Sequence, residues 1–183
     1  QSGKTTLLKT LIYSGALQNK DTEILVLAPT HGSVKELLWR HFTKADAPLF
    51  DPALVLYKNN QDMVLELFNG SRVTFRGTEN VDSLLGREVD LLIVDEWQSH
   101  NPEIWTYLEP LLASRNGNAV FTGTARKGNH IMDFYKRGQC TEFWESWRIT
   151  TPMSGSPAGS PENIKIAKSS MSEEQFNQEY LCV

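Results

Sequence analysis

An α/β fold with a mostly parallel central sheet is predicted for this chain of 183 residues from three observations. First, residues 1–6 read Q-S-G-K-T-T and precede a helical pattern. Second, short apolar runs alternate with amphipathic segments, which is the order expected when helices connect parallel strands. Third, residues 91–94 are apolar and lead into two carboxylates, Asp95 and Glu96. A buried strand presents such residues at its carboxyl end, where open α/β sheets bind ligands.

The alternation begins at the start of the chain. Residues 5–17 place apolar side chains at helical spacing, residues 23–28 form a short apolar run closed by Pro29, and residues 34–42 are amphipathic. These segments predict a helix, a buried parallel strand and a second helix.

An antiparallel hairpin is predicted next. Residues 63–68 and 72–75 flank Asn69-Gly70, which is a strong cue for a hairpin with a two-residue loop. In an otherwise parallel chain, we expect this pair at a sheet edge or as an added ornament.

The second half resumes the core and then changes in composition. A helix over residues 102–112 is expected to bend or end at Pro110. Residues 150–161 are rich in Ser, Gly and Pro, which predicts a loop or linker. We therefore divide the chain into a core domain, residues 1–150, and a linker with short helices, residues 151–183. The remaining predicted elements are strands over residues 90–94, 119–121 and 142–149, and helices over residues 131–136, 164–169 and 172–180, the last with a capping box from Ser172 to Gln175.

Composition excludes some classes of protein. The net charge of −4 gives no general polycation signal, so any contact with DNA must come from a local basic patch. Cys140 and Cys182 lie far apart without metal-ligand spacing, which predicts two reduced thiols. No apolar run is long enough to span a membrane. The chain starts without Met and inside a motif, so we expect it to be a piece of a longer protein.

Residues 1–6 match the second half of a phosphate-binding loop, G-x-x-x-x-G-K-[ST]. Gly3 lets the backbone curl so that N–H groups point at phosphate oxygens, and the following helix adds its positive end. Lys4 can reach the β- and γ-phosphates, and the Thr5 hydroxyl can ligate Mg²⁺. The residues expected to bind the nucleotide here are Gln1, Ser2, Gly3, Lys4, Thr5 and Thr6.

The acidic pair suits phosphoryl transfer, which depends on positioning and charge neutralisation. We expect Asp95 to hold the metal ion, commonly through water, and Glu96 to orient the attacking water or accept its proton. Residues Thr122, Gly123 and Thr124 follow the next core strand and are expected to contact the γ-phosphate and pass on its state. A polar turn without a ligand is an equally good interpretation of their spacing alone.

Together these residues resemble the ATPase domain of the large terminase subunit of tailed double-stranded DNA phages. The start Q-S-G-K-T-T looks like that family's phosphate loop, and residues 75–96 look like the segment that leads into its acidic strand. Residues 104–112 and 121–128 are similar to its helix and coupling motif, and residues 176–181 to the exit from its ATPase domain. The resemblance covers nearly the whole chain in the right order.

The resemblance implies a P-loop NTPase of the ASCE, RecA-like type, a three-layer αβα sandwich that hydrolyses ATP with Mg²⁺. It also implies a motor that assembles as a ring on the procapsid portal and drives double-stranded DNA inward. The implied partners are the portal protein and the small terminase subunit, with a C-terminal nuclease in the parent chain. The implied location is the host cytoplasm, at the procapsid portal, without retention in the mature virion.

The resemblance further implies an arginine finger, for which Arg87 is the candidate. Leu85 stands where the family commonly has Arg, so Arg76 and Arg126 remain rivals. Ala125 stands where the coupling motif often has Pro.

Two other functions stay open. The run Asp95-Glu96-Trp97-Gln98 is similar to the D-E-x-Q of superfamily-one helicases, although no second RecA-like half is found. A nucleotide-binding module without turnover is the other alternative. The five tryptophans can stack on bases, but Trp39 and Trp105 lie on helical patterns and are expected in the core. The four histidines lack metal-ligand spacing.

Overall fold

The computed structural model describes residues 3–182, so the predictions for Gln1 and Ser2 lie outside the described residues. The chain forms two compact units, one of Thr6–Thr122 and one of Gln1–Thr5 with Gly123–Val183. The predicted division into residues 1–150 and 151–183 stays a prediction.

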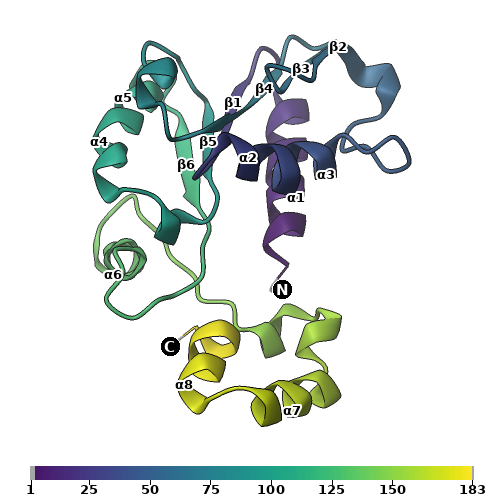
Figure 1. Cartoon of the computed structure of the whole chain (residues 1–183). Coiled ribbons are helices and arrows are strands. Elements are labelled where there is room, and N and C mark those ends of the chain that lie inside the picture. Colours follow the sequence, from purple (N-terminus) through teal and green to yellow (C-terminus); the bar gives the residue numbers. More distant parts are fainter. Residues whose placement is uncertain (1–2, 183) are drawn as a thin grey trace. The chain divides into compact units, whose positions relative to one another are not determined.

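The Thr6–Thr122 unit is built on a six-stranded sheet with the order β2-β3-β4-β1-β5-β6. Strands β4, β1, β5 and β6 run parallel, while β2 and β3 form an antiparallel edge. The predicted fold class is therefore confirmed (Figure 1). The strands are β1 (Glu23–Ala28), β2 (Val55–Asn59), β3 (Val64–Leu67), β4 (Arg72–Gly77), β5 (Leu91–Val94) and β6 (Asn118–Phe121).

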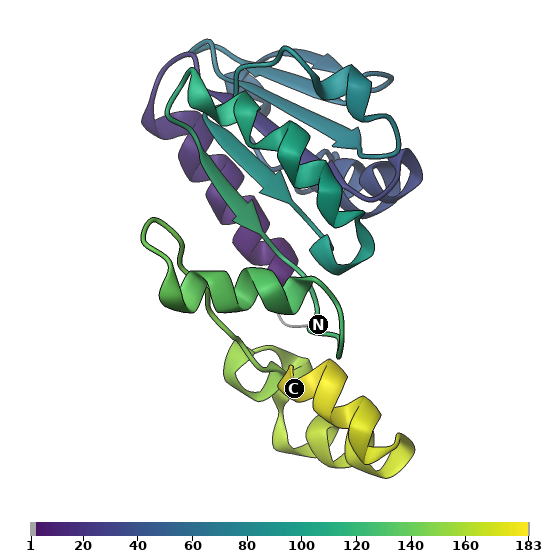
Figure 2. The same cartoon turned by 90° about the vertical axis from the view of Figure 1, so that its left-hand side faces the viewer.

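Helices cover both faces of this sheet (Figures 1 and 2). Helix α1 (Lys4–Gln18) and the continuous helical segment α2 (His31–Ser33), η1 (Val34–Trp39) and α3 (Arg40–Phe42) bury the main core cluster on one face. Because strand β1 is buried on both faces, its sequence is one apolar run without alternation. The core members include Leu8, Ile12, Ile24, Val26, Trp39, Phe42, Val73, Phe75 and Ile93.

The opposite face is covered by α4 (Trp105–Leu108) and α5 (Pro110–Ala113) (Figure 2). The two short helices are separated at Glu109, directly before Pro110, as the sequence predicts, because proline clashes with the preceding turn of a helix. Trp105 is 9% exposed and stacks edge-on against Phe121 of β6, with ring centroids 5.1 Å apart. Trp39 is also buried, so both tryptophans predicted for the core lie there.

The predicted hairpin is present, but its loop and its place in the sheet differ from the prediction. The amide of Leu67 donates to the carbonyl of Ser71 over 2.8 Å, so three residues form the loop instead of two. Gly70 takes the left-handed conformation, with φ +84°, that closes a three-residue loop. Asn69 is drawn away from a two-residue turn because its side-chain amide donates to the carbonyls of Ala16 and Asn19. Strand β4 is no ornament, since it pairs in parallel with the central strand β1.

The unit that contains Gly123–Val183 is mostly helical. The strand predicted over residues 142–149 is wrong: those residues form no strand, and Phe143 has a left-handed φ of 67°, which a strand does not accept. The capping box at Ser172 is confirmed, with reciprocal bonds to Gln175. Both cysteines are free thiols, and burial raises the pKa of Cys182, whose Sγ lies 3.7 Å from the carbonyl of Ile149. The α-helices of this unit are α6 (Ile131–Cys140), α7 (Pro161–Ser170) and α8 (Glu173–Phe176).

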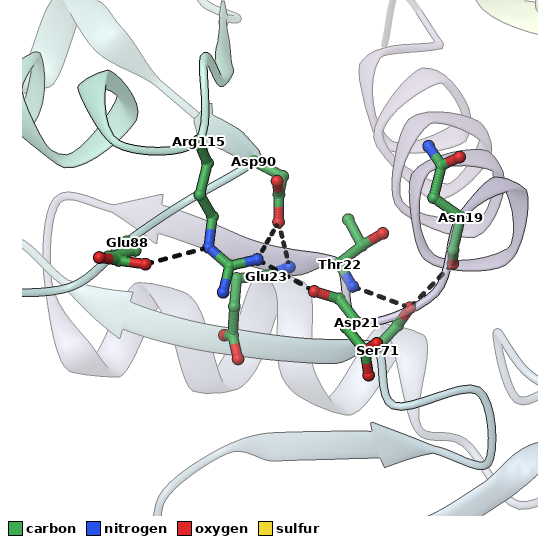
Figure 3. A network of polar contacts seen from close by, with 8 residues as sticks. All are labelled: Asn19, Asp21, Thr22, Glu23, Ser71, Glu88, Asp90 and Arg115. Carbon is green, nitrogen blue, oxygen red and sulfur yellow. Dashed lines mark hydrogen bonds and ion pairs between the residues drawn. The ribbon is translucent and has the colours of Figure 1, made fainter.

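A polar network fixes the amino ends of the central strands (Figure 3). Asp90 accepts a hydrogen bond from the Glu23 amide over 2.7 Å and pairs with Arg115 over 3.1 Å, both through Oδ2. Arg115 also reaches Glu88, with 3.5 Å between Nε and Oε2. The network joins β1, β5 and the turn before β6, so it defines the register of the parallel strands.

Replacing Asp90 with alanine is expected to lower the free energy of unfolding by about 1–3 kcal/mol, because the Glu23 amide and Arg115 lose a charged acceptor. Denaturant unfolding measures the change. Glu36→Ala is the matched control, because it removes an exposed carboxylate that pairs with Arg40 one helical turn away and such pairs contribute about 0.5 kcal/mol. Equal losses in the two variants would contradict the structural role of Asp90.

Candidate functional site

The carboxyl ends of β5 and β6 bring together two of the predicted site residues. Asp95 follows β5 and Thr122 follows β6, and the Thr122 hydroxyl donates to Oδ1 of Asp95 over 2.6 Å. Both residues are buried, with 9% and 8% of their surfaces exposed. A hydroxyl-to-carboxylate bond this short is among the stronger hydrogen bonds, so Asp95 is held in one orientation.

Glu96 is held in an unfavourable backbone conformation. Its φ of 56° and ψ of 44° are left-handed, which costs a non-glycine residue on the order of 1–3 kcal/mol. Gln98, only 5% exposed, donates its side-chain amide to Oε2 of Glu96. Strain of this kind gathers at functional sites because the surrounding structure must impose it. Gln98 was not predicted as a site residue, although the D-E-x-Q pattern contains the signal for it.

His100 is the other residue that sequence reasoning missed. It is 6% exposed, and its ring nitrogens contact the Thr78 hydroxyl at 2.8 Å and the carbonyl oxygen of Asp95 at 2.9 Å. Its ring stacks on Trp97 with centroids 5.6 Å apart. Metal-ligand spacing does not identify it, because its partners are a hydroxyl and a backbone carbonyl.

Within the other unit, Lys4 of the predicted phosphate loop contacts Thr124 of the coupling motif. Gly3 has a φ of +77°, with open space where a side chain would stand, and α1 begins at the next residue. The Lys4 ammonium donates to the Thr124 hydroxyl over 3.3 Å. Thr5 and Thr6 lie in the first turn of α1, and the backbone N–H groups and the dipole at a helix start favour an anion. Gly123 joins Thr124 to Thr122.

Arg87 lies near the amino ends of the strands, whereas Asp95 follows the carboxyl end of β5. It lines a cavity of about 230 Å³ with Glu23, Arg72 and Arg115, all near the amino ends of the strands. Asp95 lies beyond the carboxyl end of β5, a strand of four residues, which spans about 13 Å. Within one chain, the Arg87 guanidinium therefore lies at the other end of the strands from Asp95.

The rival arginines differ in their surroundings. Arg76 is half-buried in β4 and donates to the carbonyls of Asp62 and Phe75, and burial lowers its pKa. Arg126 belongs to the Gly123–Val183 segment of the other unit.

The donor set fits a magnesium nucleotide better than a metal ion held by protein alone. Among residues 3–182, no three His, Cys, Asp or Glu side chains gather into a metal site. Mg²⁺ commonly takes one or two carboxylates and completes its shell with waters and substrate phosphates. Asp95 and the Thr5 hydroxyl are groups of the required type. In the described part of the chain, no helix has the length and apolar character needed to cross a bilayer.

Comparison with known proteins identifies relatives over the whole length of the chain. Residues 1–183 match the family described as "Terminase large subunit, T4likevirus-type, N-terminal". The large terminase subunit of Escherichia phage T5 is 26% identical over 97% of this chain, which spans 40% of that relative's length.

The fold matches solved structures of large terminases. The ATPase domain of the Thermus phage P74-26 large terminase superposes with a TM-score of 0.77 at 16% identity. The match covers 100% of this chain and 84% of the Thermus phage chain. The HK97 bacteriophage large terminase has a TM-score of 0.72 at 14% identity, covering 100% of this chain and 44% of its own. A large terminase from a thermophilic bacteriophage in complex with ADP has a TM-score of 0.77 at 13% identity, with 100% and 46% covered.

Proposed function

Since the chain belongs to the family of T4-like-virus-type terminase large subunits, we propose that it is the ATP-hydrolysing motor domain of a phage packaging enzyme. The motor drives double-stranded DNA into the procapsid as a ring of copies on the portal protein, with the small terminase subunit as a partner. It works in the host cytoplasm and leaves the particle before the virion matures. A nuclease activity belongs to the rest of the parent protein.

One observation carries the proposal: the coupling motif touches both predicted halves of the site. The Thr122 hydroxyl donates to Asp95, and the Thr124 hydroxyl accepts from Lys4. These hydroxyls flank Gly123, whose backbone is the least restricted of all residues. Two peptide units join the residues that carry these hydroxyls. We propose that the signal of phosphate release is transmitted through residues 122–124 to the parts of the motor that move DNA.

The residues divide the chemistry as follows. Lys4 and the first turn of α1 bind the phosphates, while Thr5 and Asp95 would hold Mg²⁺, which would neutralise charge that develops on the phosphate oxygens. Glu96 orients the attacking water and accepts its proton. Because Arg87 lies near the amino ends of the strands, away from Asp95, we propose that its guanidinium acts on the phosphate of a neighbouring copy in the ring.

A steady-state assay of phosphate release by the full-length protein tests the proposal. We expect magnesium-dependent ATP hydrolysis that rises with procapsids and double-stranded DNA. Hydrolysis coupled to separation of DNA strands would instead identify a helicase. ATP binding without phosphate release would identify a nucleotide-binding module and overturn the motor.

Replacing Thr122 with valine is expected to lower kcat about 10–150-fold, because the Asp95 carboxylate loses a buried donor that fixes it and such donors contribute about 1.5–3 kcal/mol. Thr122→Ser keeps the hydroxyl and should retain most of the activity. Phosphate release at saturating ATP distinguishes the two variants. Equal kcat values would remove the Asp95 contact from the mechanism.

A further inference from the structure

The carboxyl ends of β4, β1, β5 and β6 lie around Asp95. Backbone hydrogen bonds join each of these strands to the strand beside it. The Asp95 amide donates to the carbonyl of Leu27 over 2.8 Å, and the Thr78 amide donates to that of Ala28 over 3.1 Å. Strands β4 and β5 both pair with β1 and are therefore two strand spacings apart, about 10 Å. No ladder bond can span that distance.

His100 makes the link that the ladder cannot make. Its Nδ1 lies 2.8 Å from the hydroxyl of Thr78, directly after β4, and its Nε2 lies 2.9 Å from the carbonyl oxygen of Asp95, directly after β5. Because a carbonyl oxygen only accepts, Nε2 carries the hydrogen of that bond. The Thr78 hydroxyl also lies 3.3 Å from the carbonyl of Pro29, so the end of β1 belongs to the same cluster.

The carbonyl that accepts from His100 belongs to Asp95 and helps to set the backbone conformation of Glu96. The Asp95 carbonyl and the Glu96 amide form one rigid peptide plane, and the orientation of this plane sets φ of Glu96. Glu96 has its left-handed φ of 56° at this point. A hydrogen bond that holds the plane therefore also holds the direction in which the Glu96 side chain leaves the backbone.

We propose that His100 is a positioning residue for ATP hydrolysis, which fixes the Asp95–Glu96 peptide plane through its Nε2–H and anchors it to β4 through Thr78. This inference rests on the proposed function. In this role His100 makes no contact with the nucleotide. Loss of the link leaves Asp95 bonded to Thr122 but lets the peptide plane rotate, so the loss falls on turnover rather than on binding.

Three substitutions in the full-length protein separate the two hydrogen bonds. Gln carries its amide nitrogen near the position of Nε2, and Asn carries its amide near that of Nδ1. His100→Gln should keep the Asp95 bond and stay within about threefold of the wild-type kcat. His100→Asn and His100→Ala should lose about 10–100-fold in kcat, because displacement of a reacting group by about 1 Å can cost 100-fold. The Kd for ATP should stay within about threefold in all three variants.

Leu67→Ala is the control for a general loss of stability, because Leu67 is 2% exposed and lies in β3, apart from the strand ends around Asp95. It should lower the melting temperature at least as much as His100→Ala and leave kcat within about twofold. The positioning role is overturned if His100→Asn turns over like the wild type, or if kcat falls equally in Leu67→Ala.

A second measurement does not depend on hydrolysis. In wild-type protein labelled with ¹⁵N at histidine, the His100 resonances, assigned by their loss in His100→Gln, should show a protonated Nε2 whose hydrogen is shared with a carbonyl. An Nε2 without hydrogen would overturn the inference even in an active enzyme. If the wild-type protein binds ATP but never releases phosphate, the proposed function fails, while the resonance still decides whether His100 holds Asp95.

Discussion

Replacing Glu96 with glutamine is expected to leave ATP bound and to lower turnover about 10²–10⁴-fold, the range that a positioned general base contributes. Glutamine has nearly the same size and still accepts from Gln98, so the strained backbone of Glu96 can persist. The amide cannot take a proton from water. The loss therefore falls on kcat, while the Kd for ATP changes little.

Phosphate release and ATP binding must be measured on the same preparation, in the full-length protein. Glu109→Gln is the matched control, because it makes the same chemical change at an exposed position between α4 and α5. The control should turn over at the wild-type rate. Hydrolysis by Glu96→Gln at that rate would exclude Glu96 from any role with the attacking water.

The fold was largely predictable because its signals are local. Residues 24–28 and 91–94 are apolar without alternation, which is the mark of strands buried on both faces, and both runs form central parallel strands. Pro110 divides a helix for reasons of backbone geometry alone. A distant contact decided one outcome that was not predicted: the loop at Asn69 lengthened because its side chain bonds to the end of α1. Residues 142–149 form no strand, because Phe143 has a left-handed φ.

The sequence predicts candidate residues for the site but not the contacts among them. The rule that parallel strands present ligands at their carboxyl ends predicted Asp95, and the structure pairs it with Thr122 from the next strand. His100 contacts a backbone carbonyl, and no spacing in the sequence encodes that contact, whereas the contact of Gln98 with Glu96 falls within the D-E-x-Q pattern. The left-handed φ of Glu96 is equally hidden, since glutamate has no preference for it.

Replacing Lys4 with alanine is expected to weaken ATP binding at least 100-fold, which corresponds to about 2.8 kcal/mol at 1.4 kcal/mol for each tenfold change. Lys4 begins α1 next to Gly3, so its charge adds to the partial positive charge of the helix end. Without nucleotide, its ammonium donates to Thr124, a neutral hydroxyl that triphosphate oxygens would outcompete.

Calorimetric titration of Mg-ATP into full-length Lys4→Ala measures this loss, and the rise in melting temperature with added ATP should disappear along with binding. Lys9→Ala is the matched control on the same helix, because the Lys9 ammonium packs over the Phe42 ring, 5.8 Å from its centre. That control should bind ATP like the wild type. If Lys4→Ala binds Mg-ATP within about threefold of the wild type, the phosphates do not lie at the start of α1. Because Thr124 ties Lys4 to the coupling motif, that result would also remove the proposed route from phosphate to Asp95.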